Sequence, residues 1–301
     1  MSAQPFRTDR NDKTTADLPI GAPLTYQARL QNEPRWALTE GSQFFEGKSA
    51  VQDTLRKITR QLDELGIAYA VSGGLALFAH GYRRFTEDVD LLVTPEGLKQ
   101  VHQALDGLGY IRPFPGSKNL RDTESRVKVE FLVTGQFPGD GKPKPVAFPD
   151  PATVAIEKDG IKYLTLPSLI ELKLASGMTE PTRLKDISDV IELIKLLDLP
   201  EDLSAQLAPF VRDKFIELWR SVQQAPRRFV MLWRNKFLTA GAKSIGEIAR
   251  TFRESADLLE SMNADGVTLD PDAGTADDYA HLVTTDPVIA KKYGMHDEAE
   301  F

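Results

Sequence analysis

The chain has 301 residues and a mass of 33.4 kDa, and 41% of its residues are apolar, which is enough to fill one large core or two smaller ones. It contains no cysteine, which excludes disulfides, thiolate metal ligands and a cysteine nucleophile. No apolar run approaches the roughly 18 residues that a membrane-spanning helix needs, and the polar N-terminus lacks the apolar centre of a signal peptide. We therefore expect a cytoplasmic protein with no membrane partner.

The net charge of -7 is unevenly distributed along the chain. Residues 254–301 carry 12 acidic side chains and 2 lysines, whereas the preceding 253 residues carry 35 basic and 32 acidic side chains. An acidic protein can therefore still have a basic binding face on its main body. Three roles stay open for the acidic tail: it folds back over such a face, it binds a partner, or it stays mobile.

Apolar spacing and turn residues predict a small α/β unit over residues 49–165, preceded by a polar arm or irregular cap over residues 1–48. Periods of three to four indicate helices, and alternation or short apolar runs indicate strands. The expected elements, in chain order, are a helix over 49–65, a strand over 67–71, a short helix over 75–80, a strand over 89–93, a helix over 95–108, a strand over 126–133 and a hairpin over 154–164.

The remainder of the chain is predicted to be helical over residues 166–265, followed by the acidic tail at 266–301. A Gly- and Pro-rich stretch over 134–151 is expected to form a flap or connector. Basic and aromatic residues alternate over 215–237, which fits either an RNA-binding face or an amphipathic helix pair with its aromatic rings in the core. The helices expected here lie at 166–175, 187–197, 203–221, 226–239 and 244–263.

Two aspartates lie at alternate positions of the strand that contains "DVDLLV". Strand alternation places Asp88 and Asp90 on one face, roughly 6 to 7 Å apart, while Val89 and Leu91 point into the core. Adjacent carboxylates repel each other unless a positive charge lies between them, and Mg²⁺ prefers carboxylate oxygens and shares its shell with substrate phosphates. The alternative is a solvated strand end.

The glycine pair Gly73-Gly74 lies between a predicted strand and a predicted helix. Glycines allow backbone amides to approach an anion closely, and the positive end of a helix dipole adds to the attraction. No Gly-Lys-Ser/Thr sequence follows, so this is not a Walker P-loop. The pair indicates a phosphate-binding turn, and the alternative is an ordinary tight turn.

Together these residues carry a family resemblance. The sequence "GG", thirteen residues, and then "DVDL" resembles the signature of the DNA polymerase β-like nucleotidyltransferase superfamily. The longer string "GGLALFAHGYRRFTEDVDLLV" is similar to the AbiEii-type minimal bacterial nucleotidyltransferases, many of which are toxins of toxin–antitoxin pairs. The resemblance covers about residues 50–195. It implies an α+β nucleotidyltransferase fold, a small mixed β-sheet flanked by helices, with residues 49–165 as the catalytic domain. The helical pattern of the later residues predicts that an all-helical part follows this domain.

The resemblance also implies a third metal-binding carboxylate on a later strand. Glu130 in "VKVEFL" matches that position, and its implied role is to complete a metal site and to help deprotonate the attacking hydroxyl. Asp122 and Glu124 are the alternatives. The implied metal is Mg²⁺ or Mn²⁺, bound by Asp88, Asp90 and Glu130.

Basic residues in "ELKLASGMTEPTRLKDISDV" resemble those with which the family contacts its nucleotide, and Lys173 and Arg183 are the implied phosphate or base contacts. Arg84 either touches the triphosphate or pairs with Glu87. Many family members have Ser after the first glycine, whereas this chain has Gly74. Any hydroxyl contact to the phosphates therefore has to come from Ser72, or the backbone binds them alone.

The sequence thus predicts a metal-dependent nucleotidyltransferase that binds an NTP such as ATP and moves its nucleoside monophosphate to an acceptor hydroxyl. The expected acceptor is a tRNA 3′ end or another RNA, with an antitoxin protein as a further partner. A protein hydroxyl and a small molecule such as an aminoglycoside are the alternative acceptors. The alternative from another class is a non-catalytic nucleotide- or RNA-binding module of the same fold. The preferred base and the oligomeric state stay open.

Overall fold

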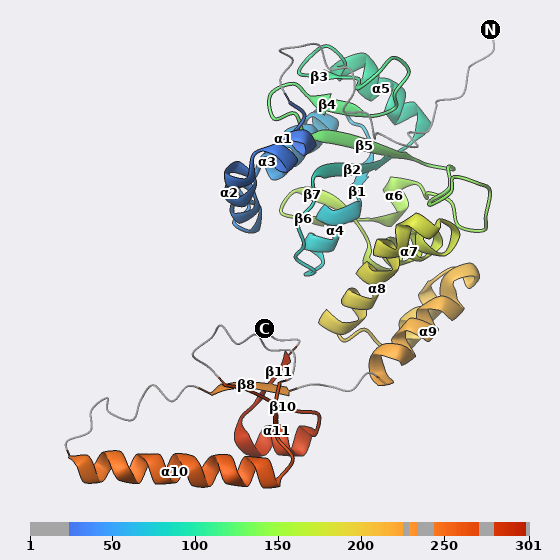
Figure 1. Ribbon diagram of the computed structural model, residues 1–301. Helices are drawn as coiled ribbons and strands as arrows, with labels where there is room; N and C mark the ends of the chain where they lie inside the picture. The colour runs from blue at the N-terminus through green and yellow to red at the C-terminus, as the bar shows by residue number, and fades with distance from the viewer. Residues whose placement is uncertain (1–23, 225–228, 234–243, 271–279, 299–301) are drawn as a thin grey trace. The chain divides into compact units, whose positions relative to one another are not determined.

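Figure 1 shows the computed structural model of the chain, which describes residues 24–224, 229–233, 244–270 and 280–298. The chain forms two compact units, residues 1–222 and residues 223–301. The boundary at residue 222 lies inside the segment 166–265, for which the sequence predicts one helical domain. Most of that segment therefore belongs to the first unit and the remainder to the second.

A seven-stranded mixed sheet forms the centre of the first unit, with strand order β3-β4-β5-β2-β1-β7-β6. The pairs β2–β5 and β1–β7 are parallel, and the other neighbours are antiparallel. This sheet and the helices around it confirm the α+β class. The strands are β1 Tyr69–Val71, β2 Asp88–Val93, β3 Tyr110–Ile111, β4 Leu120–Asp122, β5 Lys128–Val133, β6 Ala155–Lys158 and β7 Ile161–Leu164.

Helices cover both faces of the sheet. One buried core joins the sheet to α1, α2, α3 and α5, and a second joins it to α4, α7, α8 and α9. Val89 and Leu91 belong to the first core and Leu92 to the second, so Asp88 and Asp90 lie on the face of the second core. The helices are α1 Tyr26–Asn32, α2 Pro34–Phe45, α3 Ala50–Glu64, α4 Gly73–Ala79, α5 Pro95–Leu105, α6 Pro151–Val154, α7 Leu166–Thr179, α8 Leu184–Leu196 and α9 Pro209–Gln224, with 3-10 turns at Pro181–Arg183 and Glu201–Gln206.

Most of the elements expected between residues 49 and 197 are confirmed to within a few residues. Helix α3 begins at a capping box, in which the Ser49 side chain accepts from the backbone of Gln52 and the Gln52 side chain accepts from the backbone of Ser49. Its apolar stripe is buried in the first core. The sequence does not predict strands β3 and β4, because runs of two and three residues are too short to show a period.

The prediction of an N-terminal arm is wrong for residues 24–48, which form the helices α1 and α2. These helices are anchored in the first core by Tyr26 and Phe44, which are 1% and 0% exposed. Each helix is short and contributes few large apolar residues, so its period is weak in the sequence. Residues 1–23 lie outside the described part of the chain.

The stretch expected to form a flap or connector is held against α7. Lys144 Nζ donates to Pro138 O at 2.5 Å and to Thr179 Oγ1 at 2.8 Å, and it pairs with Asp140 Oδ1 at 2.5 Å. Val146 and Phe148 in the same stretch are buried in the second core. The segment is therefore a packed connector.

The run of basic and aromatic residues is described only in part. In α9 Phe215 is buried in the second core, Trp219 Nε1 donates to Leu199 O at 2.7 Å, and Arg220 pairs with Glu201 at 3.0 Å. These contacts favour the amphipathic packing helix over an RNA-binding face. The remaining basic residues of that run, Arg227, Arg228, Arg234 and Lys236, lie outside the described residues.

The second unit contains a four-stranded antiparallel sheet of order β11-β8-β10-β9. Strand β8 lies within residues 166–265, so the prediction of an all-helical part is wrong there, and the other three strands lie within residues 266–301, for which the sequence predicts only an acidic tail. The helix expected over 226–239 is replaced by β8 at Phe229–Trp233, because a short apolar run fits either structure until a strand such as β10 pairs with it. The helix expected over 244–263 is confirmed as α10. The elements are α10 Ile245–Ala264, β9 Thr268–Leu269, β10 Ala280–Thr284, α11 Pro287–Tyr293 and β11 His296–Asp297.

The described residues include no helix that is both long enough and apolar enough to cross a membrane.

Candidate active site

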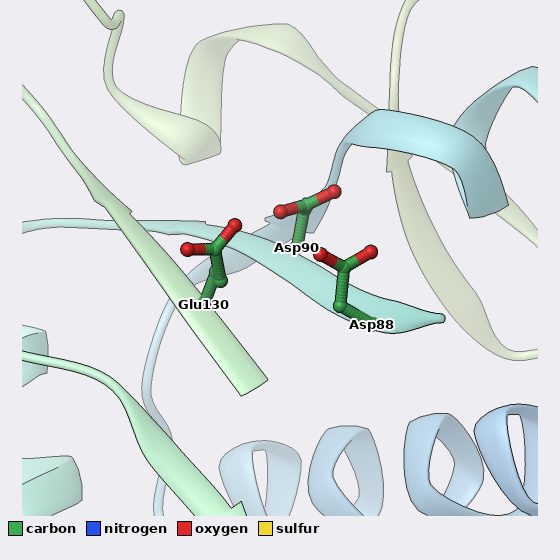
Figure 2. A group of neighbouring side chains, drawn as sticks. All are labelled: Asp88, Asp90 and Glu130. Carbon is green, nitrogen blue, oxygen red and sulfur yellow. The ribbon is translucent and has the colours of Figure 1, made fainter. Parts of the chain in front are cut away.

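Three carboxylates converge on one face of the sheet. The parallel register of β2 and β5 sets Asp90 opposite Glu130 and Asp88 opposite Lys128. One carboxylate oxygen from each of Asp88, Asp90 and Glu130 lies within 4.8 Å of the other two. Figure 2 shows the three carboxyl groups on the same side of the two strands, turned toward one another. The structure therefore brings together the three acids that the sequence predicts to bind a metal.

The alternative third acids have other positions. Asp122 is buried, its Oδ2 pairs with Lys57 Nζ at 2.5 Å, and its Oδ1 accepts from the backbone amides of Glu124 and Ser125 at 2.8 Å. This arrangement closes the turn between β4 and β5. Glu124 is exposed on the same turn. Neither residue belongs to the cluster of three carboxylates.

The glycine pair makes room for this cluster. Gly73 begins α4 with a φ of +59°, and a Cβ at this position would lie 1.8 Å from Asp90 Oδ2. A Cβ on Gly74 would lie 2.6 Å from the Cβ of Thr86. A side chain at either position would therefore displace Asp90 or Thr86.

Ser72 lies directly before this pair. It is 5% exposed, and its backbone N–H donates to Asp90 O at 2.9 Å, which joins β1 to β2. Its hydroxyl does not cap α4, whose first turn begins at the next residue. The predicted roles of Ser72, Gly73 and Gly74 in binding phosphate stay predictions.

Neighbouring side chains hold the carboxylates. Thr86 Oγ1 donates to Asp88 Oδ1 at 3.0 Å. Lys128 Nζ donates to Glu130 Oε1 at 2.8 Å, and Asn119 Nδ2 donates to the same oxygen at 3.4 Å. Sequence reasoning missed Thr86 and Asn119 as supporting residues. Thr86 has the strand parity of the two aspartates, which could have identified it, whereas Asn119 precedes a strand too short to be recognised.

The electrostatics of the cluster follow from burial and proximity. Burial raises the pKa of Asp88, and the charge of Glu130 adds to the shift. Burial also raises the pKa of Asp90 well above its usual value, with further contributions from Asp88 and Glu130. Burial disfavours the charged form of Glu130 too, but Lys128, together with Lys118 and Arg183, outweighs it and lowers the pKa of this carboxyl.

A divalent cation fits these residues. Three carboxylate oxygens form the kind of donor set that Mg²⁺ and Mn²⁺ prefer. A cation held by Asp88, Asp90 and Glu130 would replace mutual repulsion by attraction, and it would lower the pKa of the two aspartates.

Two of the predicted nucleotide-binding cations form a buried network beside the acids. Lys173, which is 6% exposed, lies between Asp186 Oδ1 at 2.9 Å and Asp189 Oδ2 at 2.6 Å. Arg84 binds both oxygens of Asp189, at 2.8 and 2.9 Å. Arg84 therefore forms its ion pair with Asp189. The predicted alternative, an ion pair between Arg84 and Glu87, is wrong.

Arg183 has a more open position. Its side chain is 57% exposed, and Nη1 lies 3.6 Å from Asp186 Oδ2. The charges of Lys173 and Arg183 both oppose the rise in the pKa of Asp90, so both lie close enough to act on the cluster of acids. The site thus has three carboxylates on the sheet and positive charge on the neighbouring helical segments.

Comparison with known proteins gives matches among solved structures only. No protein-family model matches the chain, and no curated protein matches it. One matching structure is an antigenic nucleotidyltransferase-like protein from Paracoccidioides brasiliensis, with 17% identity, a TM-score of 0.33 and coverage of 58% of this chain and 92% of that chain.

Two further matches have similar scores. ANT(2")-Ia in complex with adenylyl-2"-tobramycin has 13% identity, a TM-score of 0.35 and coverage of 56% of this chain and 96% of that chain. A candidate nucleotidyltransferase from H. pylori has 18% identity, a TM-score of 0.33 and coverage of 70% of this chain and 93% of that chain. Because these TM-scores are low, the function of the chain has to be inferred from the geometry of its own site.

Proposed function

We propose that the chain is a metal-dependent nucleotidyltransferase, which moves a nucleoside monophosphate from an NTP to an acceptor hydroxyl and releases pyrophosphate. The observation that carries this proposal is the convergence of Asp88, Asp90 and Glu130, with one oxygen of each within 4.8 Å of the others. Mg²⁺ or Mn²⁺ held there would supply charge neutralisation and alignment of the attacking and leaving oxygens. The close approach of α4 to Asp90 places backbone amides beside these acids.

The protein's own groups contribute positioning and charge. Lys128 keeps Glu130 ionised, as a metal ligand must be, because it lowers the pKa of this carboxyl against the effect of burial. Thr86 orients Asp88 through its hydroxyl. Amides at the start of α4 and the exposed guanidinium of Arg183 are the groups that we assign to the triphosphate. Lys173 and Arg84 act through Asp186 and Asp189 and hold the helices in place around the site.

We assign the acceptor hydroxyl to a tRNA 3′ end, with the chain acting as the toxin of a toxin–antitoxin pair. This assignment rests on the similarity of residues 73–93 to the AbiEii-type enzymes. Growth arrest on expression, relieved by the product of a neighbouring gene, is the expected result. Resistance to an aminoglycoside without growth arrest would instead identify a small-molecule acceptor.

The central experiment incubates the full chain and Mg²⁺ with each α-labelled NTP and, separately, with total RNA, protein extract or small metabolites. Transfer of label to one fraction, with release of pyrophosphate, is expected for the wild-type chain. Asp90→Asn should abolish transfer, whereas Asp213→Asn on α9, far along the chain from the cluster, should leave it unchanged. Retention of transfer by Asp90→Asn would exclude the proposed mechanism. Binding of an NTP without turnover, independent of the metal, would identify the non-catalytic module.

A further inference from the structure

The segment that leads into Asp88 is fixed by a different contact at each residue. In residues 84–86 the contact is made by the side chain, and in Glu87 it is made by the backbone carbonyl. The contacts are Arg84 to Asp189 on α8 at 2.8 and 2.9 Å, the ring of Phe85 to the ring of Phe44 on α2 at 5.1 Å, Thr86 Oγ1 to Asp88 Oδ1 at 3.0 Å, and the carbonyl of Glu87 to Gln27 Nε2 on α1 at 3.1 Å.

The last of these contacts belongs to a bridge between the two strands that carry the acids. Gln27 Nε2 donates to Glu87 O at 3.1 Å, and Gln27 Oε1 accepts from Arg121 Nη1 at 3.0 Å. Arg121 Nη1 also donates to Arg126 O at 2.7 Å. Glu87 lies directly before β2, and Arg126 lies two residues before β5. The side chain of Gln27 therefore connects the starts of the strands that carry Asp88 and Glu130.

Helix α1, which carries Gln27, is tied to α2, α3 and the start of β5 by buried contacts. Tyr26, the neighbour of Gln27, is 1% exposed, and its Oη donates to Glu40 Oε1 at 3.1 Å. The same Glu40 oxygen accepts from the backbone of Ala50 at 2.7 Å, which ties α1 and α2 to the start of α3. The backbone N–H of Tyr26 also donates to Arg126 O at 3.4 Å. Gln27 thus follows directly after a buried residue, Tyr26, whose hydrogen bonds hold this turn of α1 in place.

We propose that Gln27 is a positioning residue for Asp88, which acts by holding the Glu87 carbonyl of the peptide bond that precedes this metal ligand. The inference rests on the proposed function, since it treats Asp88 as a ligand of a divalent cation. Fixing the carbonyl of Glu87 fixes the plane of the peptide that joins it to Asp88, and this restricts the directions that the Asp88 side chain can take. Substitution of residues that orient metal ligands in this way lowers the affinity for the metal.

The test measures Mn²⁺ binding to the full chain without nucleotide, by electron paramagnetic resonance of the free ion. Gln27→Ala should raise the Kd for Mn²⁺ roughly 3- to 10-fold, as expected for the loss of a supporting hydrogen bond. The matched control is Asn32→Ala, which also removes a side-chain amide donor from α1, but one that bonds to Ala28 O within the helix, at 2.6 Å. Asn32→Ala should leave the Kd unchanged.

Hydrogen exchange in the metal-free chain separates positioning from general loosening. In Gln27→Ala the amides of residues 85–89 should exchange faster than in the wild type, while those of α3 exchange at the wild-type rate. Transfer by Gln27→Ala should recover at high Mg²⁺ concentration, because the variant lowers metal affinity and leaves the ligands in place.

The outcomes distinguish this inference from the proposed function. A wild-type chain that binds Mn²⁺ and a Gln27→Ala variant with the same Kd would overturn the role of Gln27 and leave the metal site standing. A wild-type chain with no Mn²⁺ binding would overturn both. An equal rise in Kd for Gln27→Ala and Asn32→Ala would show that α1 acts through stability alone, which also contradicts the proposal.

Discussion

The carboxylate of Asp90 occupies the space that a side chain at Gly73 would fill, since a Cβ at position 73 would lie 1.8 Å from Asp90 Oδ2. The absence of a side chain at Gly73 therefore leaves the space that the Asp90 carboxylate, the proposed metal ligand, occupies. In the sequence the same glycine suggests only a turn through which a phosphate could reach the backbone. Both roles place the first turn of α4 against the acids, and the steric role is the one that can be tested without any nucleotide.

Gly73→Ala should impair the site more than a comparable change elsewhere. The added methyl group collides with Asp90, and the residue has a φ of +59°, which disfavours alanine. We expect a loss of roughly 1–3 kcal/mol in the free energy of unfolding and at least a tenfold rise in the Kd for Mn²⁺. Urea denaturation and Mn²⁺ titration measure the two effects.

Gly66→Ala is the matched control for this variant. Gly66 has a φ of +67°, and a methyl group added there would meet no neighbouring atom within 4 Å, so it shares the backbone strain without the collision. It should lose stability by about 1 kcal/mol and keep its metal affinity. Equal Mn²⁺ affinity in the two variants would show that Gly73 does not shape the site.

Asp90→Asn should separate stability from activity. Asp90 is half-buried and is repelled by Asp88 and Glu130, so removal of its charge should raise the melting temperature of the metal-free chain at neutral pH. The same variant should lower nucleotidyl transfer at least about 100-fold, because a metal ligand is lost. A melting temperature below that of the wild type would contradict the repulsion inferred for this cluster.

Asp88 and Asp90 should make a pH-dependent contribution to the stability of the metal-free chain, which a comparison of the wild type with Asp90→Asn isolates. The pKa of each is higher in the folded chain than in the unfolded one, so these two carboxyls bind more protons in the folded state, and their contribution to stability falls as the pH rises above about 4. Unfolding of wild type and Asp90→Asn, measured from pH 4 to 8, should show a growing advantage for the variant. Saturating Mg²⁺ should reduce that advantage, and a difference independent of both pH and Mg²⁺ would contradict this account.

Asp189→Ala should destabilise the fold through its buried network. Asp189 is 2% exposed and pairs with both Arg84 and Lys173, so its removal leaves two cations without their shared partner. A loss of about 3–5 kcal/mol is expected from urea denaturation. Glu192→Ala, which breaks the exposed pair with Lys195 on the same helix, should change stability by less than about 1 kcal/mol. Similar losses in the two variants would show that the network does not support the fold.

Local patterns predict much of the first unit and part of the site. Helix α3 is recognisable because its cap and its apolar stripe lie within one segment. Asp88 and Asp90 are recognisable as a pair because alternation along a strand is a local property. The short strands β3 and β4, and β8 in place of a helix, escape prediction because their stability comes from partner strands.

The roles of the basic residues also depend on distant partners. The sequence predicts a nucleotide contact for Lys173 and either a triphosphate contact or a Glu87 ion pair for Arg84, and the structure pairs both with Asp189. Nothing in the segments around Arg84 indicates that its partner lies on α8. Gln27 gives no signal at all, since an isolated glutamine in a polar stretch has no pattern.

By itself, the sequence determined which chemical groups alternate along β2 and that a glycine pair precedes them, since both are properties of neighbouring residues. The tertiary structure alone decided that Glu130 lies opposite Asp90, that Gly73 leaves space for the Asp90 carboxylate and that Asp189 binds Lys173 and Arg84. These relationships depend on strand register and helix packing between segments far apart in the chain, which no local pattern encodes.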